Sequence, residues 1–218
     1  MLQTAPYRYL TLDRDDGVAP VALTNPEKRN ALSLEAMEEM LGIFEALGAD
    51  TGVKAIGLRA VGPAFSSGHD LREIQCAGDE ADVARFRAIF DTCVRMMTAI
   101  QTIPQPVIAE IAGIATAAGC QLVATCDLAI ASSEARFATP GVKIGLFCTP
   151  PMVALTRAIG RKRAMEMLLT GDFIDAATAE SWGLVNRVVA PAELSDATAA
   201  LARKIASASA FTVGLGKA

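Results

Sequence analysis

Residues 107–131, with the sequence VIAEIAGIATAAGCQLVATCDLAIA, decide the fold of this chain. Val107–Ile111 and residues 127–131 are short apolar runs of the kind that form buried strands, and residues 117–125 have the composition of a buried helix. Gly113 supplies a turn between the first strand and the helix. Because such strands and helices must cover one another's apolar faces, this stretch predicts an α/β fold.

The same alternation of strands and helices extends in both directions along the chain. Ser33 is a typical N-cap residue, and the apolar spacing after it predicts a helix that ends near Leu47. Beyond Pro150 the pattern is mainly helical. No linker or repeat interrupts the sequence, which predicts one globular domain. The further expected strands are 7–13, 18–23, 53–58 and 184–189, a further helix is expected at 82–100, and a loop at 62–70.

Composition excludes several classes of protein. The 218 residues include 20 Lys and Arg against 24 Asp and Glu, so the net charge of −4 argues against nucleic-acid binding. A hydrophobic content of 52% excludes a disordered chain. The single histidine, His69, excludes a metal site with several histidines. The uncharged run 111–126 is too short to cross a membrane, and no secretory signal is visible, so a cytoplasmic protein is expected.

Two turns rich in small residues are the candidate site. They are FSSGHDL at residues 65–71 and GIATAAGCQ at residues 113–121. Each is expected to follow a strand and to open a helix, whose first N–H groups have no partner. Two such turns facing each other can hold one oxygen that becomes negative during a reaction. The alternative is that both turns serve close packing only.

Other common catalytic and nucleotide-binding motifs are absent from the sequence. Ser66-Ser67-Gly68 does not fit the G-x-S-x-G pattern of serine hydrolases, and no P-loop occurs. Residues 113–119 do not fit the dinucleotide-binding pattern G-x-G-x-x-G. The two small-residue turns therefore carry the functional hypothesis.

The residues in and around these turns give the chain a resemblance to the enoyl-CoA hydratase/isomerase (crotonase) family over nearly its whole length. It is carried, in order, by Asn25-Pro26 with Asn30-Ala31-Leu32-Ser33, residues 65–71, residues 118–122 with 126–131, residues 137–140 with Gly145, and Thr170-Gly171 with Ala176 and residues 183–185. The resemblance implies an α/β spiral of ββα units, assembled as trimers or dimers of trimers. It also implies that the partner is an acyl-CoA thioester and that no separate cofactor is needed, because coenzyme A is part of the substrate.

The resemblance implies roles for particular residues. The two oxyanion donors fall on the backbone N–H groups of His69 and Ala118. Contacts to the substrate fall on Lys28, Arg29, Ala31, Ser67, Gly68, Asp70, Leu71 and Arg72. Residues 1–190 would form the acyl-CoA-binding core, and 191–218 would begin a C-terminal helical trimerisation region, which the family extends beyond Lys217 and which is therefore expected to be incomplete here.

The sequence departs from the family at the two positions where hydratases carry glutamates. These positions hold Gln121 and Gly141, and neither can transfer a proton at neutral pH. The position used by the isomerase branch is also not acidic, since Cys148-Thr149-Pro150 occupies it. Three interpretations remain open: a nominal enoyl-CoA hydratase, a weak or inactive acyl-CoA binder with a regulatory role, or an enzyme of another CoA-thioester reaction.

Other ionisable side chains have both a structural and a chemical interpretation. Asp70 is expected to cap a helix that starts at Leu71. Glu110 lies in an apolar strand and is either a satisfied structural carboxylate, a subunit contact or a buried base with a raised pKa. Asp127 matches a family position that is structural. The imidazole of His69 either takes part in the chemistry or simply points into the pocket or core.

Overall fold

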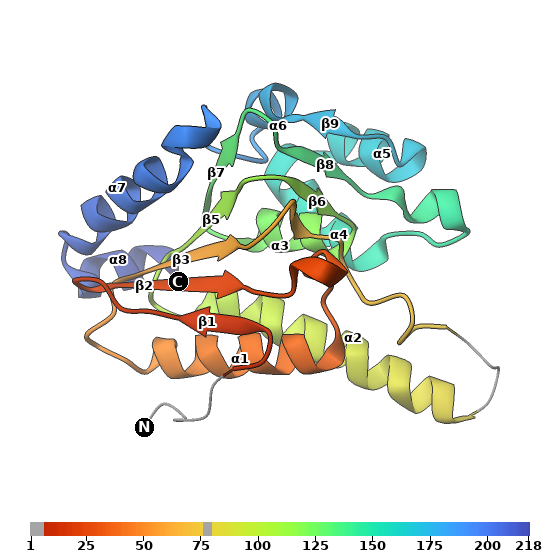
Figure 1. The fold of residues 1–218 in the computed structure, drawn as a ribbon, viewed down its shortest axis with the longest axis horizontal. Coiled ribbons are helices and arrows are strands. Elements are labelled where there is room, and N and C mark those ends of the chain that lie inside the picture. Colours follow the sequence, from red (N-terminus) through yellow and green to blue (C-terminus); the bar gives the residue numbers. More distant parts are fainter. Residues whose placement is uncertain (1–6, 76–79) are drawn as a thin grey trace.

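The computed structural model describes residues 7–75 and 80–218, which form two sheets and the helices that pack on them (Figure 1). In the larger sheet, β1 is antiparallel to β2 and all other neighbours are parallel. Its strands, in spatial order, are β1 (Leu10–Leu12), β2 (Val18–Leu23), β3 (Ala55–Ala60), β5 (Val107–Ile111), β7 (Leu128–Ser132) and β10 (Arg187–Val189). The smaller sheet consists of β4 (Ala64–Ser66), β6 (Ile114–Thr116), β8 (Arg136–Ala138) and β9 (Ile174–Asp175).

Side chains cap the first turns of α1, α6 and α8. Ser33 starts α1, because its Oγ accepts a hydrogen bond from the N–H of Ala36 at 3.2 Å. The α-helices are α1 (Leu34–Gly48), α2 (Glu80–Thr102), α3 (Ala118–Thr125), α4 (Thr149–Ile159), α5 (Arg161–Thr170), α6 (Ala176–Trp182), α7 (Leu194–Ala206) and α8 (Ala210–Lys217). Three short 3₁₀ helices are η1 (Pro26–Lys28), η2 (Pro140–Ile144) and η3 (Pro191–Glu193).

The order of elements repeats along the chain. β3, β5 and β7 of the larger sheet are each followed at once by a strand of the smaller sheet, β4, β6 and β8 respectively. α2 follows the first of these pairs and α3 the second, while η2 and then α4 follow the third. This arrangement confirms the predicted α/β spiral of ββα units.

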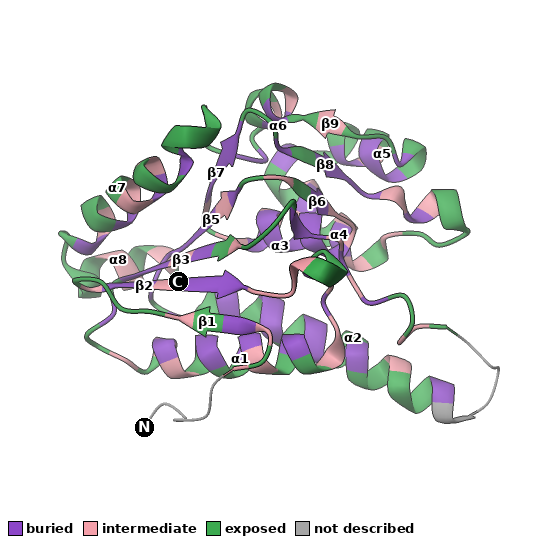
Figure 2. Cartoon of the chain, in the orientation of Figure 1, coloured by how far each residue is buried: buried purple, intermediate pink, exposed green. Residues whose placement is uncertain are grey.

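The larger sheet is covered on both faces (Figure 2). Ile56 and Val107 join the main core, which includes the buried faces of α1, α2 and α3. Their neighbours Ala55 and Ile108 point to the opposite face and pack with α7 in a smaller cluster. The alternation of side chains along each strand therefore divides the core into two layers.

The predicted elements differ from the structure mainly in the smaller sheet. The segment 62–70, expected as a loop, contains β4, and β6, β8 and β9 were not predicted. Residues 71–74 form a turn, so the first small-residue turn does not open a helix as expected. The strand expected at 184–189 is confined to β10. Within the described ranges, no helix is both long and apolar enough to cross a membrane.

Candidate active site

Asn30 holds together the segments that carry the candidate ligand-binding residues. Its buried side chain donates to the carbonyls of Val61 at 2.9 Å and Ala64 at 2.8 Å, and accepts from the N–H of Asn25 at 2.9 Å. In turn, Ser66 Oγ donates to the carbonyl of Asn30 at 2.8 Å. The loop at residues 25–31 is therefore fixed to β4 and to the small-residue turn that follows β4.

A basic groove of about 480 Å³ lies along these two segments. Lys28, Arg29 and Arg72 are exposed at its edge and are suited to phosphate groups. Every residue predicted to contact substrate lines this groove, except Gly68. The full lining is Glu27, Lys28, Arg29, Ala31, Ser67, His69, Asp70, Leu71 and Arg72.

Asp70 is not the helix cap that its sequence context predicts. Its Oδ1 accepts hydrogen bonds from the backbone N–H of Arg72 at 3.0 Å and from Arg72 Nε at 3.1 Å, which closes a turn. Burial raises the pKa of Asp70, but the hydrogen bonds from Arg72 outweigh burial and hold the pKa below its ordinary value. Asp70 therefore fixes the direction of Arg72 at the groove.

The second small-residue turn lies directly against the first. A Cβ added to Gly68, which has φ of +87°, would lie 3.0 Å from the backbone nitrogen of Ala118. Thr116 Oγ1 also donates to the carbonyl of Ser67 at 3.1 Å. Ala117 precedes α3 with φ of +50°, a conformation that costs a non-glycine residue about 1–3 kcal/mol and is typical of functional sites.

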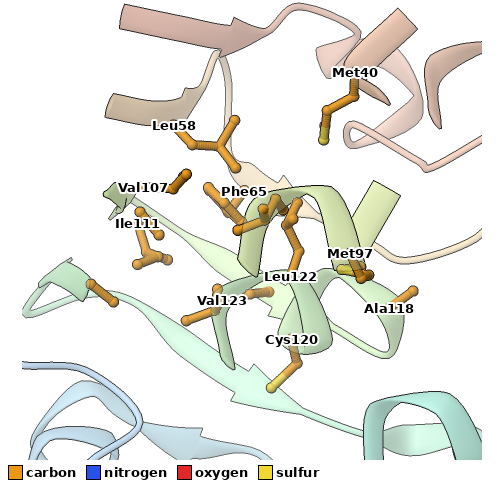
Figure 3. Packing of buried hydrophobic residues seen from close by; sticks show 14 of the residues in the cluster. Met40, Leu58, Phe65, Met97, Val107, Ile111, Ala118, Cys120, Leu122 and Val123 are labelled. Carbon is orange, nitrogen blue, oxygen red and sulfur yellow. The ribbon is translucent and has the colours of Figure 1, made fainter. Parts of the chain in front are cut away.

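α3 is held in this position by the main core. Leu122 and Cys120 of α3 are fully buried, and Phe65 of β4 belongs to the same cluster (Figure 3). A Cβ added to Gly119 would lie only 2.3 Å from the carbonyl oxygen of Ser66, so α3 can approach β4 this closely only with glycine there. The start of α3 is therefore placed by packing rather than by the candidate ligand.

The backbone N–H groups of His69 and Ala118 are both available in this arrangement. Neither donates a hydrogen bond within the part of the chain that the structure describes. Ala118 begins α3, where the helix dipole adds a partial positive charge. Two free donors at adjoining turns can stabilise an oxygen that gains negative charge.

An apolar groove of about 550 Å³ continues from the basic groove, because Ser67, His69 and Leu71 line both. Most of its wall comes from Ile74, from α2, and from the segment around η2 and the start of α4. Sequence analysis named Gly141 and residues 148–150 among these but did not assign the others to the site, which are Ile74, Phe90, Pro140, Lys143, Ile144, Leu146, Phe147 and Pro151. Several of them are exposed apolar side chains, which would be covered by an apolar ligand.

The ring of His69 is held mainly by apolar packing beside the two grooves that the residue lines. Both ring nitrogens are buried and make no hydrogen bond within the described residues. The ring packs edge-on against Phe90, with centroids 5.5 Å apart and an interplanar angle of 78°. Burial lowers the pKa of the imidazole, and the nearby Leu32 backbone opposes this only in part. His69 is therefore neutral at pH 7.

Gln121 and Gly141, the positions at which the family resemblance leads one to expect glutamates, differ in the space around them. Gln121 is buried on α3, and its Oε1 has no hydrogen-bond partner among the described residues. Gly141 lies in η2, where an added Cβ would be 2.8 Å from Cys148 Sγ and 2.9 Å from the carbonyl oxygen of Leu146. The direction that a side chain of residue 141 would take is therefore filled by Cys148.

The other candidate carboxylates lie away from both grooves. Glu110 lies beneath α7, where burial raises its pKa while Arg59 and Thr198 oppose the shift. Asp127 Oδ2 accepts from the backbone N–H of Val107 and from Lys217 Nζ, each at 2.7 Å, which confirms its structural role. Within residues 7–75 and 80–218, no three His, Cys, Asp or Glu side chains gather as a metal site would require.

Comparisons with known proteins place this geometry among relatives. A family model described as Enoyl-CoA hydratase/isomerase matches residues 13–217. The human protein named Enoyl-CoA hydratase domain-containing protein 3, mitochondrial, is 48% identical over 203 residues, which cover 93% of this chain and 66% of that protein. The chain thus spans about two thirds of the length of this relative.

Two crystal structures superpose closely on this fold. One is an enoyl-CoA hydratase of Mycobacterium smegmatis, with a TM-score of 0.92 and 47% identity, covering 96% of this chain and 80% of that one. The other is the human domain-containing protein 3, with a TM-score of 0.92 and 46% identity, covering 96% of this chain and 82% of that one.

Proposed function

The chain belongs to the enoyl-CoA hydratase/isomerase family, and we propose that it binds acyl-CoA thioesters and stabilises their enolates with the N–H groups of His69 and Ala118. The observation that carries this proposal is the contact between the two turns at Gly68, beside two unpaired donors. One such donor contributes about 3–4 kcal/mol to a developing oxyanion.

The two connected grooves match the two ends of such a ligand. The phosphates of coenzyme A would lie along Lys28 and Arg29, and the acyl chain would enter the apolar groove beside Leu71. The thioester then reaches the junction of the grooves, where His69 lies. Coenzyme A is part of the substrate, so we propose no separate cofactor.

The reaction that we propose is nominally the hydration of an enoyl-CoA. A weak or inactive acyl-CoA binder, or an enzyme of another CoA-thioester reaction, is the alternative that Gln121 and Gly141 favour. Neither residue is acidic, and Cys148 fills the space beside Gly141. Each missing acid or base lowers a rate by about 10²–10⁴.

Calorimetry and a hydration assay on the same preparation test this proposal. Butyryl-CoA is expected to bind with a Kd on the order of micromolar, and replacing Lys28 and Arg29 by Ala should weaken binding of the CoA thioester more than that of butyryl-pantetheine. Turnover of crotonyl-CoA distinguishes the enzyme from the inactive binder. Absence of binding to any of a panel of acyl-CoA thioesters would contradict the proposal.

Restoring a carboxylate tests which group the site lacks. Gln121→Glu keeps the shape of the side chain and is expected to raise crotonyl-CoA hydration. Gly141→Glu clashes with Cys148 Sγ and Leu146, so it should be combined with Cys148→Ala. Gln121→Ala is the matched control, because it opens the same space without adding a carboxylate. If Gln121→Glu and Gln121→Ala behave alike, the pocket serves another reaction.

We also propose that the protein is cytoplasmic and forms homotrimers or dimers of trimers, with residues 191–218 as part of the trimer contact. α7 and α8 lie in this segment. The human relative is named mitochondrial, which is a statement about that protein. Sedimentation of the purified chain tests the assembly, and fractionation of its source cells tests the location.

A further inference from the structure

The imidazole of His69 is the polar group of the site that its surroundings leave unexplained. Both ring nitrogens are buried, and neither is paired with a side chain among the described residues; the backbone of Leu32 is the one hydrogen-bonding group that acts on the pKa of the ring. Phe90 fixes the ring edge-on rather than offering it a partner. An orphaned polar side chain in a cavity indicates that a ligand supplies the missing contact.

His69 is also the group in the apolar groove that is able to accept a proton near neutral pH. Of the described residues that line this groove, the other ionisable ones are Lys143 and Cys148. Lys143 Nζ forms an ion pair with Asp172 Oδ1 at 2.7 Å and is a hydrogen-bond donor in that contact. Burial raises the pKa of the Cys148 thiol, so it also holds its proton.

The place of His69 would bring this residue close to the reacting carbon of a bound thioester. The residue lines both grooves and therefore lies at their junction. If its N–H holds the thioester oxygen, the α-carbon is only two bonds from that oxygen. The ring and the oxyanion donor then belong to the same residue, on a backbone fixed by the hydrogen bond from the N–H of Leu32 to the carbonyl of Gly68 at 2.8 Å.

We propose that the His69 imidazole transfers the α-proton of the bound thioester, the task that the family resemblance leads one to expect of carboxylates at the positions of Gln121 and Gly141. This inference rests on the proposed function. A ring nitrogen takes the proton as the α-carbon–hydrogen bond breaks, and the electron pair moves to the thioester oxygen between the N–H groups of His69 and Ala118. Return of the proton from the ring to the carbon reverses the step, so no further reactant is needed.

Exchange of the α-hydrogens of butyryl-CoA in D₂O, followed by mass spectrometry, tests the inference directly. His69→Gln keeps the backbone N–H and removes the basic ring nitrogen. We expect the exchange rate to fall by about 10²–10⁴-fold while the Kd from calorimetry stays within about twofold of its original value. Circular dichroism reports whether the variant folds.

The pH profile provides a second readout that a structural role would not change. Because burial lowers the pKa of His69 below its ordinary value, exchange by the original chain should decline only on the acid side of that ordinary value, where the ring becomes protonated. The charged and titratable groups that line the two grooves around this ring are Glu27, Lys28, Arg29, Asp70, Arg72, Lys143 and Cys148.

Glu110→Gln is the matched variant, since it removes a part-buried ionisable group that lies away from both grooves. Exchange that persists in His69→Gln, or that is lost equally in Glu110→Gln, would overturn the assignment. Butyryl-CoA that binds to the original chain without any exchange would overturn it too. Butyryl-CoA that does not bind at all would instead count against the proposed function itself, so the two failures are distinguishable.

Discussion

Gly68→Ala is expected to destabilise the folded chain and to weaken thioester binding, because Gly68 is where the two turns touch. An added Cβ would lie 2.9 Å from Ala117 Cβ and 3.0 Å from both Ala118 N and the Thr116 carbonyl oxygen. Relief of these contacts must move the turns apart. The separation of the two backbone donors would then increase.

The loss of stability expected for Gly68→Ala has two causes, the strained backbone and the new close contacts. A left-handed conformation costs alanine about 1–2 kcal/mol, and overpacking a tight contact adds about 1–3 kcal/mol. The sum, about 2–5 kcal/mol, lowers the Tm of a chain of this size by about 4–20 °C.

Substitutions at two other glycines distinguish the contribution of the backbone from that of the contacts. Gly145 has φ of +76° with no atom within 4 Å of an added Cβ, so Gly145→Ala should show the backbone part alone. Gly42 lies within α1 and is equally unobstructed, so Gly42→Ala should stabilise the chain by about 0.5–1 kcal/mol.

Urea denaturation gives the unfolding free energies of the three variants, and calorimetry with butyryl-CoA gives their affinities. We expect Gly68→Ala to be the least stable and to lose binding. If Gly68→Ala is no less stable than Gly145→Ala, the two turns do not touch as described, and the basis for two converging donors is removed.

Three further outcomes follow from described contacts. Gly141→Ala should lower the unfolding free energy by about 1–3 kcal/mol, and adding Cys148→Ala to this variant should restore part of the loss, as measured by urea denaturation. If the effects of the two substitutions simply add, a side chain at position 141 does not contact Cys148. Lys217→Met should lower the unfolding free energy by about 1–3 kcal/mol, since the carbonyls of Ile100 and Gln105 and the carboxylate of Asp127 lose their buried donor; an unchanged urea midpoint would contradict this. Because the folded-state pKa of Asp70 is lowered, its stabilising contribution is complete above about pH 4 and is lost as the pH falls through that lowered value. Arg72→Ala should therefore reduce the loss of stability in acid, and an identical acid profile would argue against this pair.

The sequence predicted best those elements whose own residues show the apolar pattern of a strand or the cap of a helix. Val18–Leu23 and Val107–Ile111 form strands with the expected bounds, and Ser33 caps α1 as expected. β4, β6 and β8 are three residues each, and each pairs with a strand that is distant in sequence. Their pairing depends on tertiary position, which a local pattern does not contain.

The site shows the same division between local and tertiary information. The motifs predicted both small-residue turns, and the structure brings these turns into contact at Gly68. Asp70 was assigned to a helix cap because the same side chain suits a cap and a turn, and only the following residues decide between them. The apolar wall at Ile144 and Phe147 was not predicted, because its residues become neighbours only when the segment around η2 folds over the turns.

Asn30 and Ser66 join the loop that carries Lys28 to the turn that carries His69, so the two move as one body. If the proposed function holds, a thioester bound at Lys28 has lost most of its translational and rotational entropy before its reactive end reaches His69. Without the contact at Lys28, this entropy would be lost on reaching the transition state and would add to the barrier. The contact at Lys28 itself takes no part in the chemistry. Binding of the nucleotide end then positions the thioester at His69. A thioester that lacks the nucleotide end should therefore react more slowly as well as bind more weakly.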